Sequence, residues 1–162
     1  MSVIILKTLV NAPVEQCFDL ARSIDLHVHS MKNANEEAIA GCTSGLIGIN
    51  ETVTWKAKHL GFYFTMTSRI SAMKIPVYFI DEMVKGPFER LHHQHVFTPK
   101  GQKTEMTDIF EFSAPFGWLG LIVEKIFLKG YMKSLLRNRN KTIQDEANKY
   151  QLKENISLTK KP

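Results

Sequence analysis

The sequence has few cysteines and no long hydrophobic run. Cys17 and Cys42 are its two cysteines, and their separation does not match the ligand spacing of a zinc site, so we expect reduced thiols. No stretch approaches the ~20 apolar residues that a transmembrane helix requires. The first apolar run, Val3 to Leu6, has no basic leader or cleavage site, unlike a signal peptide. These absences favour a cytoplasmic protein.

The composition predicts one globular domain. The chain has 162 residues, of which 44% are hydrophobic and 23% are charged, and a chain of this size buries enough surface to fold without disulfides or a structural metal. We place the domain at 1–150 and a flexible basic tail at 151–162. The net charge of +5 is concentrated after residue 124, but aromatic side chains do not interleave with the basic ones, so no nucleic-acid partner is expected.

Alternating apolar and polar residues dominate the chain up to residue 115. Trp55, for example, shares one side of a run with Val53 and Ala57, whereas threonines and lysines occupy the other side. Short turns separate such runs, which is typical of an antiparallel meander. The expected strands are 3–10, 36–41, 51–58, 62–70, 75–84, 88–98 and 104–112, with two short helical pieces near 13–21 and 24–31.

After residue 117 the period becomes helical, from about Trp118 to Tyr150. This helix would be ~50 Å long. Its apolar residues lie on two opposite faces, which a break near Gly130, or burial of the first half on two sides, would reconcile. The predicted fold is therefore α+β, with a curved antiparallel sheet of about six or seven strands wrapped around a long C-terminal helix. A sheet that curls around a helix tends to leave a hollow.

Basic residues recur every four positions along this helix, preceded by apolar residues near Phe116 and Trp118. Ordinary packing beneath a solvated basic row explains the pattern, and a transient contact with an anionic membrane is the alternative. The oligomeric state is not predicted. The basic row consists of Lys125, Lys129, Lys133, Arg137 and Lys141.

One carboxylate falls on an apolar side of the last expected strand. Asp108 shares that side with Met106 and Phe110, and in the preceding strand His93 and His95 share a side. An unpaired buried carboxylate costs several kcal/mol, so Asp108 should have a partner, and His93 or His95 is the obvious one.

The register of the histidine strand leaves an alternative. Phe88 has the opposite parity to His93, so a shift by one residue would instead turn Arg90, His92 and Gln94 inward.

Three roles compete for His93, His95 and Asp108. They could orient a ligand, act in catalysis with an imidazole as general base, or supply three metal ligands. We favour the first role, and expect neither a metal nor a cofactor. Apolar side chains of the sheet and the helix would complete the cavity wall: Trp55, Phe64, Met66, Phe79, Phe110, Met132 and Leu135. His27, His29 and His59 fall in expected loops or surface ends and are assigned no role.

The order of elements resembles that of the START and Bet v 1-like (SRPBCC, helix-grip) proteins over roughly residues 2 to 150. The resemblance implies an internal cavity that binds or transports a small hydrophobic ligand, such as a lipid, quinone, aromatic or polyketide-like molecule. The alternative is a polyketide cyclase or dehydratase-like enzyme that uses His93, His95 and Asp108. We expect a binding protein rather than an enzyme. The matching stretches are Ala12-Pro13-Val14-Glu15-Gln16-Cys17-Phe18-Asp19, Glu51-Thr52-Val53-Thr54-Trp55-Lys56-Ala57, Phe79-Ile80-Asp81-Glu82-Met83 with Gly86 and Phe88, His93-Gln94-His95-Val96-Phe97 and Pro115-Phe116-Gly117.

Overall fold

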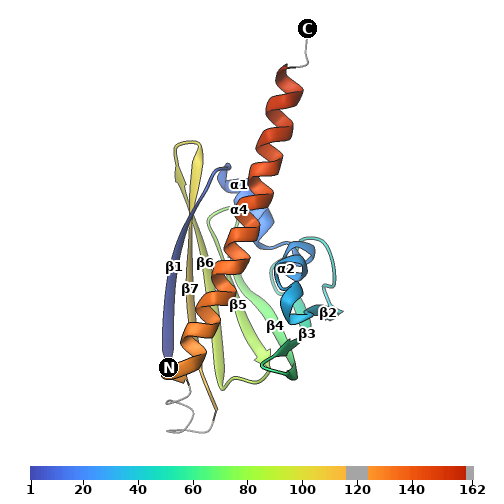
Figure 1. The fold of residues 1–162 in the computed structure, drawn as a ribbon, viewed down its shortest axis with the longest axis vertical. Helices are drawn as coiled ribbons and strands as arrows, with labels where there is room; N and C mark the ends of the chain where they lie inside the picture. The colour runs from blue at the N-terminus through green and yellow to red at the C-terminus, as the bar shows by residue number, and fades with distance from the viewer. Residues whose placement is uncertain (116–123, 160–162) are drawn as a thin grey trace.

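The computed structural model describes residues 1–115 and 124–159. Seven strands and a long C-terminal helix dominate the fold, with short helices after the first strand (Figure 1). The strands are β1 (Ser2–Val10), β2 (Glu37–Gly41), β3 (Thr52–His59), β4 (Phe62–Lys74), β5 (Tyr78–Lys85), β6 (Arg90–Lys100) and β7 (Lys103–Ser113). The helices are α1 (Val14–Ala21), α2 (Ile24–Ser30), the 3₁₀ turn η1 (Lys32–Ala34), the π-helical turn η2 (Glu124–Leu128) and α4 (Lys129–Thr159).

All seven strands form one antiparallel sheet in the order β1-β7-β6-β5-β4-β3-β2. Two-residue turns join two of the hairpins. Leu60 and Gly61 both have positive φ between β3 and β4, which is the type I′ arrangement that matches strand twist. The predicted antiparallel sheet is confirmed.

The C-terminal helix α4 crosses one face of the sheet and extends beyond it (Figure 1). Leu136, Ile143 and Ala147 are buried on its inner face, at the spacing of a helical stripe. On the same side, Phe18 of α1 packs edge-on against Phe79 and Phe97, with ring centroids 5.5 Å and 5.3 Å away. The helices therefore cover the concave face that the sheet must bury.

The start of the C-terminal helix differs from a regular α-helix. The π-helical turn ends at Leu128 and regular α-helix begins at Lys129, so the geometry changes just before Gly130, where the sequence suggested a break. Phe116, Trp118 and the other residues up to 123 lie outside the described residues. α4 continues into the segment expected to be a flexible tail, and the division of the chain at residue 150 stays a prediction. Within the described ranges, no helix combines the length and apolar character needed to cross a bilayer.

The register of β6 turns both histidines inward. Phe88 precedes β6, which begins at Arg90, so its parity places no constraint on His93. His93 and His95 are buried, whereas Arg90 is exposed. The alternative with Arg90, His92 and Gln94 inward is therefore wrong.

Candidate ligand-binding cavity

The concave face of the sheet, α2 and α4 enclose a cavity of about 730 Å³. Its lining is mostly apolar and includes Trp55, Phe79 and Leu136. Leu60 and Phe64 also line it, yet 54% and 37% of their surfaces are exposed, so the cavity reaches the surface beside the β3–β4 turn. This volume is that of a pocket for a drug-sized molecule.

Nearly all of the predicted site residues border the cavity. Asp108 is the exception: it lies behind the two imidazoles and is almost completely buried. The bordering residues are Trp55, Phe64, Met66, Phe79, His93, His95, Phe110, Met132 and Leu135. Their contact with a ligand stays a prediction.

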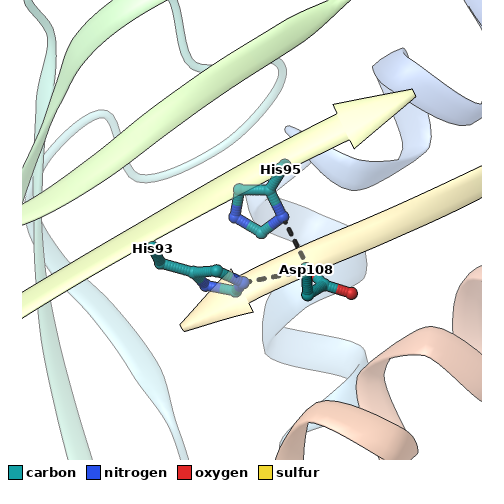
Figure 2. A group of neighbouring side chains, drawn as sticks. All are labelled: His93, His95 and Asp108. Atoms are coloured by element: carbon teal, nitrogen blue, oxygen red, sulfur yellow. Dashed lines mark hydrogen bonds and ion pairs between the residues drawn. The ribbon is translucent and has the colours of Figure 1, made fainter. Parts of the chain in front are cut away.

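Asp108 holds both imidazoles through one oxygen. His95 is its direct partner in the β6–β7 ladder, and His93 is two residues away on the same face. His93 Nε2 and His95 Nδ1 each lie 2.9 Å from Asp108 Oδ1 (Figure 2).

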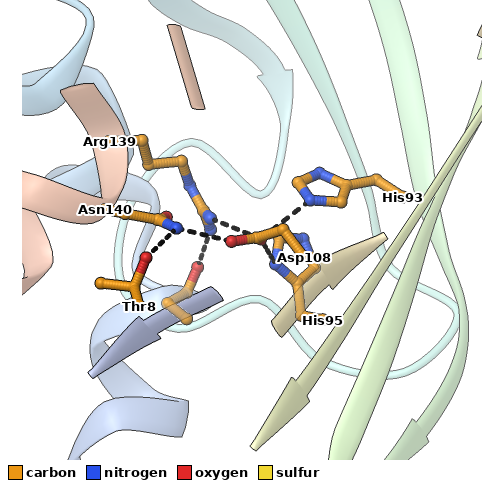
Figure 3. A network of polar contacts seen from close by, with 7 residues as sticks. Thr8, His93, His95, Asp108, Arg139 and Asn140 are labelled. Atoms are coloured by element: carbon orange, nitrogen blue, oxygen red, sulfur yellow. Dashed lines mark hydrogen bonds and ion pairs between the residues drawn. The ribbon is translucent and has the colours of Figure 1, made fainter. Parts of the chain in front are cut away.

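The second oxygen of Asp108 is bound from α4. Asn140 Nδ2 donates to Asp108 Oδ2 at 2.6 Å and to Thr8 Oγ1 of β1 at 3.0 Å (Figure 3). Side chains of α4 and β6 thus meet at a single carboxylate of β7, and Asn140 joins them to β1. Because each member is hydrogen-bonded, the buried charge is compensated.

These contacts define the charge state of the cluster. Burial would raise the pKa of Asp108, but the hydrogen bonds from His93 and His95 hold it well below its ordinary value. Burial lowers the pKa of His95 well below 6.5, and the charge of His93 lowers it further. A carboxylate accepts only, so the neutral His95 carries its proton on Nδ1 and its lone pair on Nε2. The cluster is therefore an anionic carboxylate that orients imidazoles at the cavity wall.

Arg139 and Asp81 add a second polar group to the cavity lining. Arg139 is buried, and its Nη2 donates to the carbonyl oxygen of Ala21 at 2.5 Å. Arg139 Nη1 lies 3.9 Å from Asp108 Oδ1, beyond hydrogen-bond distance. Burial raises the pKa of Asp81, and the charge of His93 opposes the rise. A carboxyl and a guanidinium therefore face the cavity near the imidazoles.

Two further histidines, His27 and His59, border the cavity, whereas the sequence placed them in loops or at surface ends. His27 stacks on Trp55 with ring centroids 4.4 Å apart, and its Nε2 lies 2.7 Å from Glu36 Oε1. His59 Nδ1 lies 2.8 Å from the Tyr131 hydroxyl oxygen, which joins the end of β3 to the first turn of α4.

The sequence interpretation also missed Asp81, Arg139 and Asn140. Asp81 is two residues from Phe79 in β5, so the alternation that indicated Asp108 applies to it as well. Arg139 and Asn140 occupy the position between Leu136 and Ile143 on the apolar stripe of α4. A polar residue at a core position of a helix was the available signal.

His93, His95 and Asp108 could also hold a metal ion, because their ligand atoms all lie within 4.8 Å of one another. A cation there would replace both hydrogen bonds to Asp108 Oδ1 and would lie close to the Arg139 guanidinium. Like charges at this separation repel strongly in a buried site. The donor set fits a metal, but its surroundings favour the hydrogen-bonded form.

No protein-family model and no curated protein matches this sequence. Solved structures do match. The Zhui aromatase/cyclase from Streptomyces sp. R1128 aligns over 91% of this chain and 93% of its own, with a TM-score of 0.72 and 11% identity. A START superfamily protein from Mycobacterium smegmatis aligns over 91% and 98%, with a TM-score of 0.69 and 12% identity. The fold is the START and Bet v 1-like helix-grip fold. The ginseng major latex-like protein 151 from Panax ginseng has it too, with 90% and 97% coverage, a TM-score of 0.65 and 14% identity.

The helix-grip fold predicted from the sequence is thus confirmed. At such low identities the likeness extends to the fold alone. One of these structures is named a cyclase and another is not, so the fold does not decide the function. The function must be argued from the cavity.

Proposed function

We propose that this protein reversibly binds a small hydrophobic molecule in its cavity, as a carrier or sensor without catalysis. One observation carries the proposal: a cavity of about 730 Å³ with a mostly apolar lining has a polar cluster on one wall. Apolar walls provide affinity by removing ligand surface from water, and a few polar groups orient the ligand. Lipids, quinones, aromatic compounds and polyketide-like molecules have this character.

The methionines in the wall support a ligand of adaptable shape. Met66 and Met132 border the cavity from opposite elements, β4 and α4. Methionine side chains are flexible and polarizable, so they repack around different apolar surfaces. We therefore expect several related compounds to bind.

A displacement assay tests the proposal. The neutral dye N-phenyl-1-naphthylamine should fluoresce in the purified protein, and Trp55→Ala should weaken its binding while the protein stays folded. Tyr63→Ala is the matched control, because Tyr63 is a largely exposed aromatic residue that does not line the cavity. Native mass spectrometry of the same preparation would identify a co-purified molecule. Absence of dye binding together with no thermal shift by lipid, quinone or aromatic compounds would contradict the proposal.

A cyclase or dehydratase-like enzyme is the second candidate. It is favoured by the arrangement in which Asp108 fixes the tautomer of His95 and leaves the Nε2 lone pair able to accept a proton. Turnover that disappears in His95→Gln and in His93→Gln, while dye binding persists, would favour this candidate over a carrier.

We further propose that the cavity opening contacts an anionic membrane transiently. Leu60, Phe62 and Tyr63 in the β3–β4 turn are 54%, 70% and 61% exposed, and Ile126 in η2 is 80% exposed. The His59–Tyr131 contact brings these two elements together beside the opening. Exposed apolar residues with neighbouring lysines favour an interface of acidic lipids. Lys58 near the end of β3 and Lys129 at the start of α4 are exposed lysines next to these residues.

A further inference from the structure

Two cavity-lining residues each have a buried polar atom without a hydrogen-bond partner among the described residues. These atoms are Arg139 Nη1 and Asp81 Oδ1. A buried donor or acceptor left without a partner costs about 1–3 kcal/mol, so such atoms usually have one. Arg139, on α4, and Asp81, on β5, line the same cavity as His93, so a bound molecule with an acceptor oxygen could satisfy Arg139 Nη1.

The charges around Arg139 restrict what that molecule can be. The carboxyl groups of Asp108, Asp81 and Glu36 all act on the Arg139 guanidinium. Glu36 is in turn paired with His27 at 2.7 Å. Asp108 lies 3.9 Å from this guanidinium, and the charges of two more carboxyl groups also act on it. A further anion would therefore be repelled in this poorly solvated site.

The second arginine in the lining does not change this balance. Arg22 Nε and Nη2 lie 2.9 Å and 2.8 Å from Asp19 Oδ1, and Nη1 donates to the Ile47 carbonyl oxygen. Its nitrogen atoms are occupied by partners of its own. Arg139 is thus the guanidinium with an available donor among the described lining residues.

We propose that the cavity selects ligands with a neutral oxygen acceptor, such as a ketone or ester carbonyl, over the corresponding carboxylates. Arg139 Nη1 donates to this oxygen. This inference rests on the proposed function and specifies the ligand class of the same cavity.

A matched set of ligands tests the selectivity on the intact protein. 2-Acetylnaphthalene, 2-naphthoate and 2-ethylnaphthalene have the same ring system but carry a neutral acceptor, an anion or no polar group. We expect the ketone to displace N-phenyl-1-naphthylamine about tenfold more effectively than either of the others, as one added hydrogen bond would give. Equal or stronger binding of the naphthoate, or equal binding of the ketone and the ethyl compound, would overturn the inference. In both cases the proposed binding function stands, whereas failure of the dye and all three compounds to bind contradicts both.

Two variants locate the effect. Asp81→Asn keeps the shape of the side chain but removes a carboxyl group that acts on Arg139, so binding of 2-naphthoate should strengthen at least about threefold while ketone binding changes little. Glu82→Gln is its control, because Glu82 is the next residue of β5, points to the opposite face and does not line the cavity. Arg139→Gln should abolish the preference for the ketone over 2-ethylnaphthalene. Because Arg139 also donates a hydrogen bond to the Ala21 carbonyl oxygen, circular dichroism checks that the Arg139→Gln variant is folded. Unchanged relative affinities for the three compounds in folded Asp81→Asn and Arg139→Gln would overturn the assignment to these residues.

Discussion

Asn140 on α4 donates a hydrogen bond of 2.6 Å to Asp108 in β7. Asp108 is one of the most deeply buried side chains, and Asn140 is 2% exposed. The contact ties the helix to the sheet at the point where the imidazoles are oriented. It also explains how a carboxylate stays ionised inside an apolar fold, since each of its oxygens accepts a hydrogen bond.

Asn140→Asp should destabilise the protein strongly at neutral pH. The substitution replaces a donor with a second carboxylate next to Asp108, and like charges this close cannot both stay ionised. We expect the free energy of unfolding to fall by about 3 kcal/mol or more, measured by urea denaturation. Asn138→Asp, on the exposed side of the same helix, should change it by less than about 0.5 kcal/mol. Equal effects of the two substitutions would show that Asp108 is not ionised.

The stability of the protein should decrease with acidification below about pH 6.5. Burial holds the pKa of His95 well below 6.5, so the folded state binds fewer protons than the unfolded state in that range. The unfolding free energy therefore rises with pH up to about 6.5 and is lost as the pH falls. Asp108 adds a further loss below its ordinary pKa of 3.8, since the pKa of Asp108 is also lowered in the folded protein.

Urea denaturation between about pH 7.5 and pH 5 checks this slope. Asp81 acts in the opposite direction, because its pKa is raised above 3.8 by burial. The contribution of His95 is therefore taken as the difference between the pH slopes of the unfolding free energy in the wild type and in His95→Gln. We expect His95→Gln to show a smaller pH dependence. Parallel pH profiles would contradict a lowered pKa of His95.

Gly41→Ala should destabilise the protein more than Gly61→Ala. Both glycines have positive φ, at 74° and 88°, so both substitutions carry a conformational cost of about 1 kcal/mol. At Gly41 the added Cβ would also meet the carbonyl oxygen of Thr52, whereas no described atom lies within 4 Å at Gly61. We expect a loss of about 1 kcal/mol for Gly61→Ala and at least twice that for Gly41→Ala in thermal denaturation. A Gly61→Ala loss as large as that of Gly41→Ala would contradict the close approach at Gly41.

Phe62→Ser should weaken co-sedimentation with vesicles of phosphatidylcholine and phosphatidylglycerol. Phe62 would be buried in the lipid interface when the protein binds, so its loss should reduce vesicle binding about tenfold or more. Ile75→Ser is the control, because Ile75 is 62% exposed but lies at the other end of β4. The binding should also weaken with salt. An equal loss of vesicle binding in Phe62→Ser and Ile75→Ser would contradict a membrane contact at the cavity opening.

The sequence alone determined the sheet and the inward direction of Asp108. Alternation in a strand is a local property, so the positions of Met106, Asp108 and Phe110 on one face followed from their spacing. The start of β6 after Phe88 settled the parity of the histidines, which the sequence had left open because strand boundaries are set by pairing with neighbours.

Only the tertiary structure decided which groups from distant elements meet at the cavity. The rotation of α4 about its axis brings Arg139 and Asn140 to Asp108, and the path of α2 places His27 on Trp55. These placements depend on how a helix packs across a curved sheet, which no short-range period specifies. The sequence therefore indicated a buried carboxylate that needs partners. The packing of α4 supplied the amide and the guanidinium beside it.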